Sequence, residues 1–445
     1  MGRATRSTSL AVFLSFLWPG LGQWYQGRRR PALLYAIPVL AAAVVIGAQL
    51  VGGVEAFVAV LITPSFALTV FILVALLGFW RLIAMGDAFM AGTIRGARPA
   101  RPILGALAIV VVAAHLWVGS VTWALYDASN RIFVGDAGPD RTPPTGSIDP
   151  SDNGQDFVAP PFATPQTTAA RINVLVTGID SGHGRDHALT DTLMLVSIDP
   201  ETKDVAMLSF PRDLSGFPLW DGRTYGGKIN SLMTYARLHQ TEFPDGGLPT
   251  LAKEIGYLAG VEVHYFASIN LEGFQKIIEL VGGVDVVNPK PINDPVYDWF
   301  DGTKGFQLAA GPVHLDGRLA LAYVRSRYGA GDSDFTRAAR QQQVLASLRK
   351  RLTQPAMIAK LPELLDATAS VVRTNFPSSR IGEMVELAGT MNDDGMARYV
   401  LGPPYAFHPP SNTTNGIYTL RLDMDRLAAL SVKIFGEDSR YSAAR

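Results

Sequence analysis

The first 126 residues are dominated by long apolar segments without charge. Three of these are long enough for a spanning helix, which needs about 20 apolar residues. They lie at residues 31–52, 56–80 and 102–126. A shorter apolar segment at residues 9–26 contains a Pro-Gly turn followed by Trp24 and Tyr25. We predict that it is re-entrant or lies at the membrane interface, with a plain spanning helix or a signal peptide as the alternatives.

Arginine is distributed unevenly around these segments. It precedes the first segment, follows it at residues 28–30 and recurs at residues 81–101, whereas the loop at 51–55 carries only Glu55. Because Lys and Arg accumulate in cytoplasmic loops, this pattern places the arginine clusters inside and everything after about residue 127 outside. We therefore predict a multi-pass protein of the cell membrane with an extracytoplasmic C-terminal part.

Residues 127–170 are rich in Pro, Gly, Ser, Thr and Asp and lack apolar periodicity, which predicts a disordered extracytoplasmic linker. From residue 171 to residue 445, strand-like and helix-like segments alternate. The expected strands are 172–180, 192–199, 204–210 and 263–269, and the expected helices are 228–240, 249–260, 271–283 and about 334–352. Asp334 is a candidate N-cap of the last helix. This alternation predicts an α/β domain with a central β-sheet flanked by helices, preceded by an all-α transmembrane region.

Charge and cysteine content narrow the possible functions. The chain has 39 basic and 39 acidic residues, so it lacks the basic excess of a nucleic-acid binder. It contains no cysteine, which excludes disulfides, thiolate nucleophiles, cysteine-ligated zinc and iron–sulfur clusters.

Two aspartates stand where neighbouring predicted strands meet a polar loop. Asp180 ends the first strand, and Asp191 begins the next. Such a pair can hold one divalent cation, because Mg²⁺ binds through one or two carboxylates and shares its remaining shell with phosphate and water. Ordinary turn-forming aspartates are the alternative.

Arginines and one glutamine recur around these aspartates in the second half of the chain. They are Arg212, Arg325, Arg327, Arg337, Arg340 and Gln341. Arg337 and Gln341 share a helix face, and Arg325 and Arg327 would face one side of an extended chain. Guanidinium groups suit phosphate oxygens, and several close together need an anion to offset their repulsion. The set therefore predicts a pyrophosphate site, although each residue alone would also suit a solvated surface.

Seven stretches between about residues 171 and 352 resemble the LytR-CpsA-Psr family of cell-wall glycopolymer ligases in order and spacing. They are NVLVTGID, TDTLMLVSID, LSFPRD, KINSLMTYA, VHYFASINLEGFQKIIELVGGVDV, GPVHLDGRLALAYVRSR and DSDFTRAARQQQ. The resemblance implies a membrane-anchored phosphotransferase with this motif core at residues 171–352. Such an enzyme moves a glycopolymer, for example teichoic acid or arabinogalactan, from a polyprenyl-pyrophosphate carrier to peptidoglycan and forms a phosphodiester. The implied partners are that lipid-linked polymer, peptidoglycan and the bilayer, with no nucleic acid.

The resemblance also assigns roles by position. Asp180 and Asp191 would hold Mg²⁺ or Mn²⁺, and Asp334 would orient the arginine cluster. The phosphate-binding residues would be Arg212, Arg325, Arg327, Arg337 and Gln341, to which we add Arg340 as their helical neighbour. Leu189 stands where the family often has arginine, so Arg185 is the expected substitute.

The expected catalytic residues are Arg212, Asp213 and Asp334, and the general base stays open between Asp191 and Asp213. Two other functions remain open at this stage. The same site could hydrolyse polyprenyl pyrophosphate with water as the acceptor. The chain could also be a non-catalytic envelope scaffold or regulator that binds the lipid-linked polymer.

Overall fold

The computed structural model describes residues 7–50, 60–61, 63–94, 101–133, 171–180, 189–299, 301–369, 371–391, 395–410 and 417–442. The chain forms two compact units, which divide between Ser129 and Asn130. Arg185, the loop with Glu55 and most of the predicted linker lie outside the described residues.

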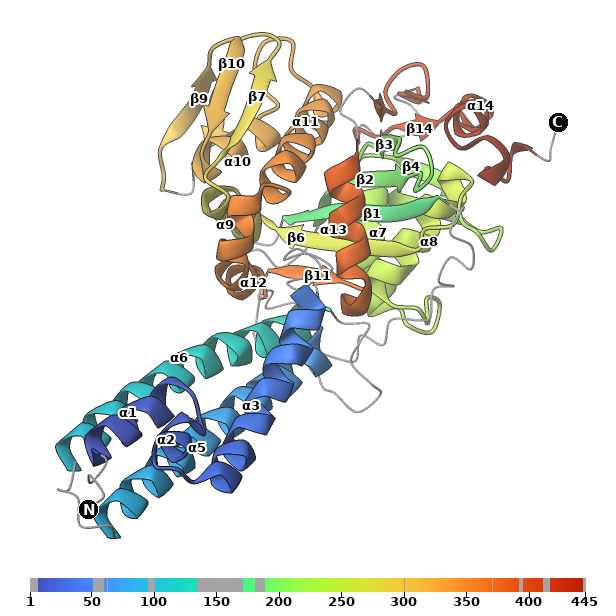
Figure 1. Cartoon of the computed structure of the whole chain (residues 1–445). Coiled ribbons are helices and arrows are strands. Elements are labelled where there is room, and N and C mark those ends of the chain that lie inside the picture. Colours follow the sequence, from blue (N-terminus) through green and yellow to red (C-terminus); the bar gives the residue numbers. More distant parts are fainter. Residues whose placement is uncertain are drawn as a thin grey trace, which may run out of the picture. The chain divides into compact units, whose positions relative to one another are not determined.

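The N-terminal unit consists of helices (Figure 1). Their bounds are α1 Thr8–Leu17, α2 Leu21–Tyr25, α3 Arg29–Leu50, α5 Pro64–Ile94 and α6 Arg101–Ile132. Of these, α3, α5 and α6 are long and apolar enough to cross a membrane. The helix expected near residues 56–80 has other bounds, since α5 continues past Arg81 to Ile94. Arg81 interrupts the apolar sequence on which the prediction is based. It does not interrupt the helix, because arginine has a high helix propensity.

The shorter apolar segment forms two short helices joined by a tight turn. With 10 residues, α1 is far below the length of a spanning helix. Gly20 adopts a left-handed conformation (φ 103°) at the turn into α2. Gly22 lets α2 approach α1 closely, because a Cβ there would lie 2.0 Å from the carbonyl oxygen of Ala11.

A polar link ties this short hairpin to α5. The buried Gln23 side chain donates to the carbonyl of Ala84 at 2.7 Å and to Asp87 Oδ2 at 3.0 Å. Arg28 donates to both carboxylate oxygens of Asp87, at 2.6 and 3.0 Å. The residues of the sequence PGLGQWYQGR therefore serve to hold the hairpin against α5.

A mixed six-stranded sheet forms the centre of the C-terminal unit, in the order β11-β6-β1-β2-β3-β12 (Figure 1). The bounds are β1 Ile172–Asp180, β2 Leu189–Ile198, β3 Val205–Ser209, β6 Tyr265–Asn270, β11 Val372–Thr374 and β12 Met396–Val400. β2 pairs antiparallel with both β1 and β3, whereas β6 is parallel to β1 and β12 is parallel to β3.

Helices cover both faces of this sheet. Because neighbouring strand residues point to opposite faces, Leu195 faces the core that includes α7 (Ile229–Leu238) and α8 (Gly247–Ala259). Met194 faces a second, methionine-rich core with Ala346 of α11 (Asp334–Leu352) and Leu387 of α13 (Ile381–Thr390). The predicted α/β fold with a central sheet and flanking helices is confirmed.

A smaller lobe with a core of its own lies between β6 and α11 in the sequence (Figure 1). Its elements are α9 Leu271–Leu280, β7 Val284–Asn288, β8 Ile292–Asp298, β9 Lys304–Leu308, β10 Gly311–Leu315 and α10 Gly317–Arg325. α11 contributes Val344 to this lobe and Ala346 to the methionine-rich core. This helix is therefore held by packing from two sides.

Shorter elements complete the unit. They are β4 Ser215–Pro218, β5 Thr224–Lys228, η2 Pro355–Lys360, α12 Leu361–Thr368, η3 Ser378–Arg380, β13 Ala406–Phe407, β14 Arg421–Leu422, α14 Met424–Phe435 and η5 Gly436–Asp438.

Candidate active site

A β-bulge sets the position of Asp191. Gly178 of β1 pairs with Thr192 and the next residue, Ile179, pairs with Thr190, so Asp191 is the extra residue in β2. A bulge re-aims a side chain and is often found next to a functional site. Asp180 ends the neighbouring strand opposite Leu189, so both aspartates lie at the same end of the β1–β2 pair.

Arg212 follows the end of β3 and contacts three carboxylates. Its Nη1 lies 2.7 Å from Asp191 Oδ1, and its Nε lies 3.6 Å from Asp213 Oδ2 and 4.0 Å from Asp334 Oδ2. Burial lowers the pKa of the Arg212 guanidinium, but Asp191, Asp334 and Asp213 outweigh it and raise that pKa above its ordinary value. The side chain is therefore a permanent cation.

Arg337 approaches the same carboxylates from the first turns of α11. Its Nη1 lies 3.2 Å from Asp334 Oδ1, and only 6% of the residue is exposed. Ser333 is the N-cap of α11, in a capping box with Thr336, so the prediction that Asp334 is the N-cap is wrong. Asp334 instead occupies the first turn, where the helix dipole favours a negative charge, and there it contacts the arginines.

Buried nitrogen atoms of these two arginines lack hydrogen-bond partners. The Nε atoms of Arg212 and Arg337 are buried, and neither has an acceptor within hydrogen-bond distance among the described residues. Burial and the neighbouring Arg212 lower the pKa of Arg337, whereas Asp334 raises it. Unsatisfied buried donors are costly, and a bound anion would satisfy them.

Gln341 and Arg340 emerge from different sides of α11. Gln341 lines the narrow cavity next to Arg212 and Arg337, and its Nε2 donates to the carbonyl of Val324 at 3.2 Å. Arg340 donates instead to the carbonyl of Ser326 at 2.5 Å and lies 3.5 Å from Asp332. In the structure, Arg340 holds the chain that follows α10.

Arg325 and Arg327 diverge, contrary to the expectation for an extended chain. Arg325 ends α10, and its Nη1 donates to the Tyr297 hydroxyl at 3.4 Å. Arg327 lies beyond the helix, with its Nη1 3.9 Å from Asp334 Oδ1. The turn between them is fixed by the buried Asp294, which accepts hydrogen bonds from Ser326 Oγ and from the backbone nitrogen of Arg327. Arg327 thus contacts the Asp334 cluster, and Arg325 contacts the smaller lobe.

Lys228 is a further cation of the site that the sequence did not reveal. Its Nζ lies 2.5 Å from Asp213 Oδ1, and Asp213 is only 6% exposed. Lys228 is the N-cap residue of α7, where the helix dipole disfavours a positive charge. A lysine at the start of a predicted helix is a signal in the sequence that could have indicated a nearby carboxylate partner.

Asp191, Arg212, Asp334, Arg337 and Gln341 line one narrow cavity. Its volume is about 10 Å³, which is no more than the space for one water molecule. The side chains of this cavity are held by ion pairs and leave little open space between them.

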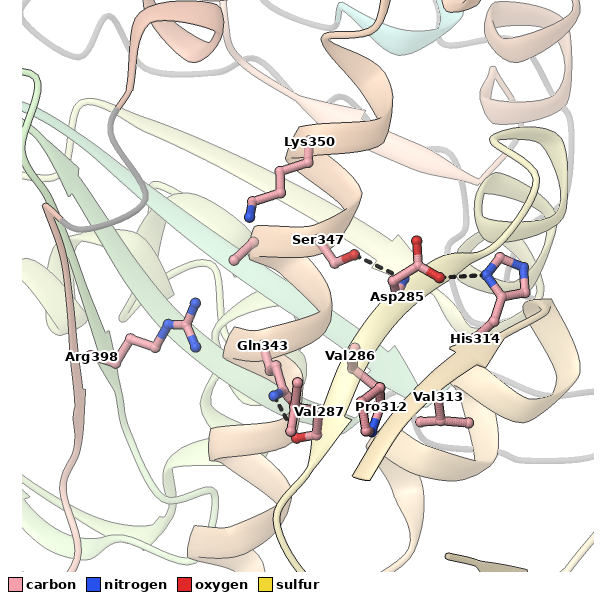
Figure 2. Close-up of a pocket in the computed structure, with 11 residues that line it drawn as sticks. Asp285, Val286, Val287, Pro312, Val313, His314, Gln343, Ser347, Lys350 and Arg398 are labelled. Carbon is pink, nitrogen blue, oxygen red and sulfur yellow. Dashed lines mark hydrogen bonds and ion pairs between the residues drawn. The ribbon is translucent and has the colours of Figure 1, made fainter. Parts of the chain in front are cut away.

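A larger hollow of about 520 Å³ lies elsewhere, between α11, β12 and the β7–β10 pair (Figure 2). Valine and proline side chains line part of it, Lys350 and Arg398 stand on one side, and the Asp285–His314 pair (2.7 Å) stands on another. None of the predicted site residues that the structure describes lines this hollow. Size therefore does not identify the reactive centre of this molecule.

Comparison with known proteins identifies relatives for the C-terminal unit. The polyisoprenyl-teichoic acid–peptidoglycan teichoic acid transferase TagU of Oceanobacillus iheyensis is 30% identical over 223 residues, which are 50% of this chain and 64% of that protein. The TagU protein of Bacillus mycoides is 28% identical over 213 residues, covering 48% of this chain and 63% of that protein. The matches span slightly less than two thirds of the length of these transferases.

Among solved structures, the crystal structure of B. subtilis TagV aligns with a TM-score of 0.48 and 23% identity, covering 61% of this chain and 97% of that chain. The model of the LytR_cpsA_psr family matches residues 148–434, which is more than half of the chain. The chain therefore belongs to the LytR_cpsA_psr family, as its motifs predict.

Proposed function

We propose that this protein is a membrane-anchored phosphotransferase that moves a glycopolymer from a polyprenyl-pyrophosphate carrier to peptidoglycan. The TagU relatives are named as transferases from polyisoprenyl-teichoic acid to peptidoglycan, which supports this class of donor and acceptor. The observation that carries the proposal is the pair Arg212 and Arg337, whose buried Nε donors lack acceptors among the described residues. Two guanidinium groups with unused donors in one cavity suit the oxygens of a diphosphate.

The reaction forms one phosphodiester and breaks one diphosphate linkage. A sugar hydroxyl of peptidoglycan attacks the phosphorus that carries the polymer, the bond to the second phosphate breaks, and polyprenyl phosphate leaves. The proton of the hydroxyl passes to a carboxylate, for which Asp191 and Asp213 are the candidates. Arg212, Arg327 and Arg337 neutralise the charge on the transferring and leaving phosphates, which is the main protein contribution to such a transfer.

Asp180 and Asp191 would hold a divalent cation, with Mg²⁺ preferred over Mn²⁺. The donor set fits, because both residues offer carboxylate oxygens at the same end of paired strands. No group of three or more acidic or histidine side chains with metal-binding spacing occurs among the described residues. Among the described residues, Asp180 and Asp191 would be the carboxylate ligands, and they would leave positions for phosphate oxygens and water, as Mg²⁺ requires. When bound, the cation would supply additional positive charge at the diphosphate.

The helices α3, α5 and α6 support a multi-pass membrane anchor. The positive-inside rule supports an extracytoplasmic catalytic unit, because the arginine clusters flank the apolar segments on one side. An anchor confines the enzyme to the surface in which a polyprenyl carrier diffuses, so the two meet in two dimensions. Which glycopolymer is carried depends on sugar contacts beyond the phosphates.

The proposal is tested with the purified full-length protein, a polyprenyl-pyrophosphate-linked glycopolymer and peptidoglycan. Wild type is expected to form polymer–peptidoglycan conjugate, and Arg337→Ala or Arg212→Ala is expected to lose about 100-fold or more of that activity. Arg351→Ala is the matched control, because Arg351 lies on the same helix but pairs with the exposed Asp285. Undiminished transfer by Arg212→Ala or Arg337→Ala would refute the site. Release of phosphate in the absence of peptidoglycan would indicate a hydrolase. Binding of the donor without any turnover would indicate a scaffold.

A further inference from the structure

Two aromatic side chains from the C-terminal end of the domain stand together at the surface. Tyr418 is 51% exposed, and its ring centre lies 4.4 Å from that of His408 at an interplanar angle of 66°. His408 Nδ1 lies 3.0 Å from the carbonyl oxygen of Thr419. His408 directly follows β13, and Tyr418 lies three residues before β14, so the short β13–β14 ladder brings the two segments together.

Backbone hydrogen bonds attach this segment to the loop that carries Arg212. The nitrogen of Leu420 donates to the carbonyl of Asp213 at 2.9 Å, and the nitrogen of Ser215 donates to the carbonyl of Leu420 at 2.9 Å. Tyr418 precedes Leu420 by two residues. Burial raises the pKa of the Tyr418 hydroxyl, and the negative charges of Asp334 and Asp213 raise it further.

The chemistry of this pair differs from that of the phosphate site. A half-exposed phenol ring offers an apolar face to the C–H groups of a sugar, and its hydroxyl offers a hydrogen bond at the rim. A neutral tyrosine adds no positive charge to offset a dianion, whereas the arginines already supply that charge. The rings therefore suit an uncharged carbohydrate better than the diphosphate.

We propose that Tyr418 and His408 form the platform on which a sugar ring of the peptidoglycan acceptor binds. This inference rests on the proposed function, because it names the acceptor subsite of that reaction. The chain next to the platform bonds the main chain of Asp213. An acceptor sugar bound there would therefore approach the site from the side of Asp213, one of the two candidate bases. Binding energy accelerates such a reaction when it holds the nucleophile in line with the transferring phosphate.

The test uses the full-length protein in detergent with soluble peptidoglycan fragments as the probe. Binding of the fragments is measured without donor, and transfer is measured over a range of fragment concentrations at saturating donor. Tyr418→Ala is the main variant, and Tyr418→Phe keeps the ring. Phe407→Ala is the control, since Phe407 is a comparably exposed aromatic residue (47%) of the same ladder and strand alternation directs it to the other face.

We expect Tyr418→Ala to weaken fragment binding and to raise the acceptor KM about five- to tenfold, which is the loss of one aromatic contact. The donor KM should stay within twofold, and Tyr418→Phe should keep most of the affinity. The platform would be overturned by an unchanged acceptor KM in Tyr418→Ala or by a donor KM that rises as much as the acceptor KM. It would also be overturned if Phe407→Ala lost as much fragment binding as Tyr418→Ala. Fragment binding that depends on Tyr418 would support the platform even if wild type transfers no polymer, in which case the proposed function alone fails.

Discussion

Carboxylates hold the arginines of the candidate site in position before any phosphate binds. Asp334 lies within 4.0 Å of Arg212, Arg327 and Arg337, which come from three different parts of the chain. One negative charge thereby offsets the repulsion among three guanidinium groups. The same charge opposes the approach of an anionic donor. Asp334 would therefore orient the three arginines but weaken the binding of the donor.

We therefore predict that Asp334→Asn separates binding from turnover. The amide keeps the size of the side chain and one acceptor oxygen, but it replaces the other oxygen by an NH₂ donor and removes the charge. The donor should bind at least as tightly as in wild type, whereas kcat should fall about tenfold or more because the arginines are no longer held. Steady-state kinetics with varied donor concentration measures both quantities. A raised donor KM with an unchanged kcat would contradict this role for Asp334.

Glu254 makes stability depend on pH at a position outside the candidate site. The residue is fully buried in α8, and burial raises the pKa of its carboxyl to about 8. Between its ordinary pKa near 4.5 and about 8, the unfolded chain loses this proton while the folded chain keeps it. The free energy of unfolding therefore falls as the pH rises through this window and levels off above it.

Replacing Glu254 by glutamine should remove this pH dependence. We expect Glu254→Gln to be more stable than wild type at pH 8 by on the order of 3 kcal/mol, with a much smaller difference at pH 5. Urea unfolding of the full-length protein in detergent at the two pH values measures the difference. Glu262→Gln, at an exposed position only eight residues away, is the control and should follow wild type. A constant difference between Glu254→Gln and wild type at both pH values would refute the assignment.

α11 is the element that organises the candidate site. One side carries Arg337 and Gln341, which line the narrow cavity. A second side carries Gln342, whose amide donates to Ser209 Oγ of β3 at 2.9 Å and to the carbonyl of Tyr399 in β12 at 2.8 Å. A third side carries Gln343 and Ser347, which bond the free edge of β7 (Figure 2). Most residues of this helix are thus committed to neighbours, which fixes the direction of Arg337.

The start of α11 is the part of this element most open to a test. The Ser333 hydroxyl accepts from the backbone nitrogen of Thr336, and Thr336 Oγ1 accepts from the backbone nitrogen of Ser333. We predict that Ser333→Ala lowers the free energy of unfolding by about 1 kcal/mol and raises the donor KM, because the first turn carries Asp334 and Arg337. Aspartate also caps helices, so Ser333→Asp should keep most of the stability and of the donor affinity of wild type. Thermal unfolding and donor kinetics measure the effects, and equal losses in the two variants would argue against a capping role.

The elements of the C-terminal unit are largely predictable from periodicity, whereas the candidate site is predictable only in part. α9 begins at Leu271 and α11 spans residues 334–352 as expected, because amphipathic spacing and caps are local properties. The divergence of Arg325 from Arg327 depends on Asp294, which lies about 30 residues earlier and is invisible to local patterns. The Lys228–Asp213 pair depends in the same way on how β5 returns to the loop after β3.

At the scale of the whole molecule, the chain divides into two units with different physical demands. The C-terminal unit buries apolar side chains in separate cores, as a water-soluble domain does. The N-terminal unit instead exposes large apolar side chains along α3, α5 and α6, which fits helices surrounded by lipid. In such surroundings the hydrophobic effect does not hold helices together, so polar links between helices gain importance.

The link between Gln23, Arg28 and Asp87 is the clearest such contact, and we predict that it fixes the α1–α2 hairpin. Asp87→Ala should release the hairpin from α5, because it removes both hydrogen bonds from Arg28 and the one from Gln23 to that carboxylate. We expect a loss of about 1–2 kcal/mol, since the pair is about one fifth exposed. Limited trypsin digestion of the full-length protein in detergent should then cleave faster at Arg28, while polymer transfer in the same preparation persists. Asp87→Glu keeps the charge and is the control. Unchanged cleavage in Asp87→Ala would mean that close helix packing at Gly22 suffices without the ion pair.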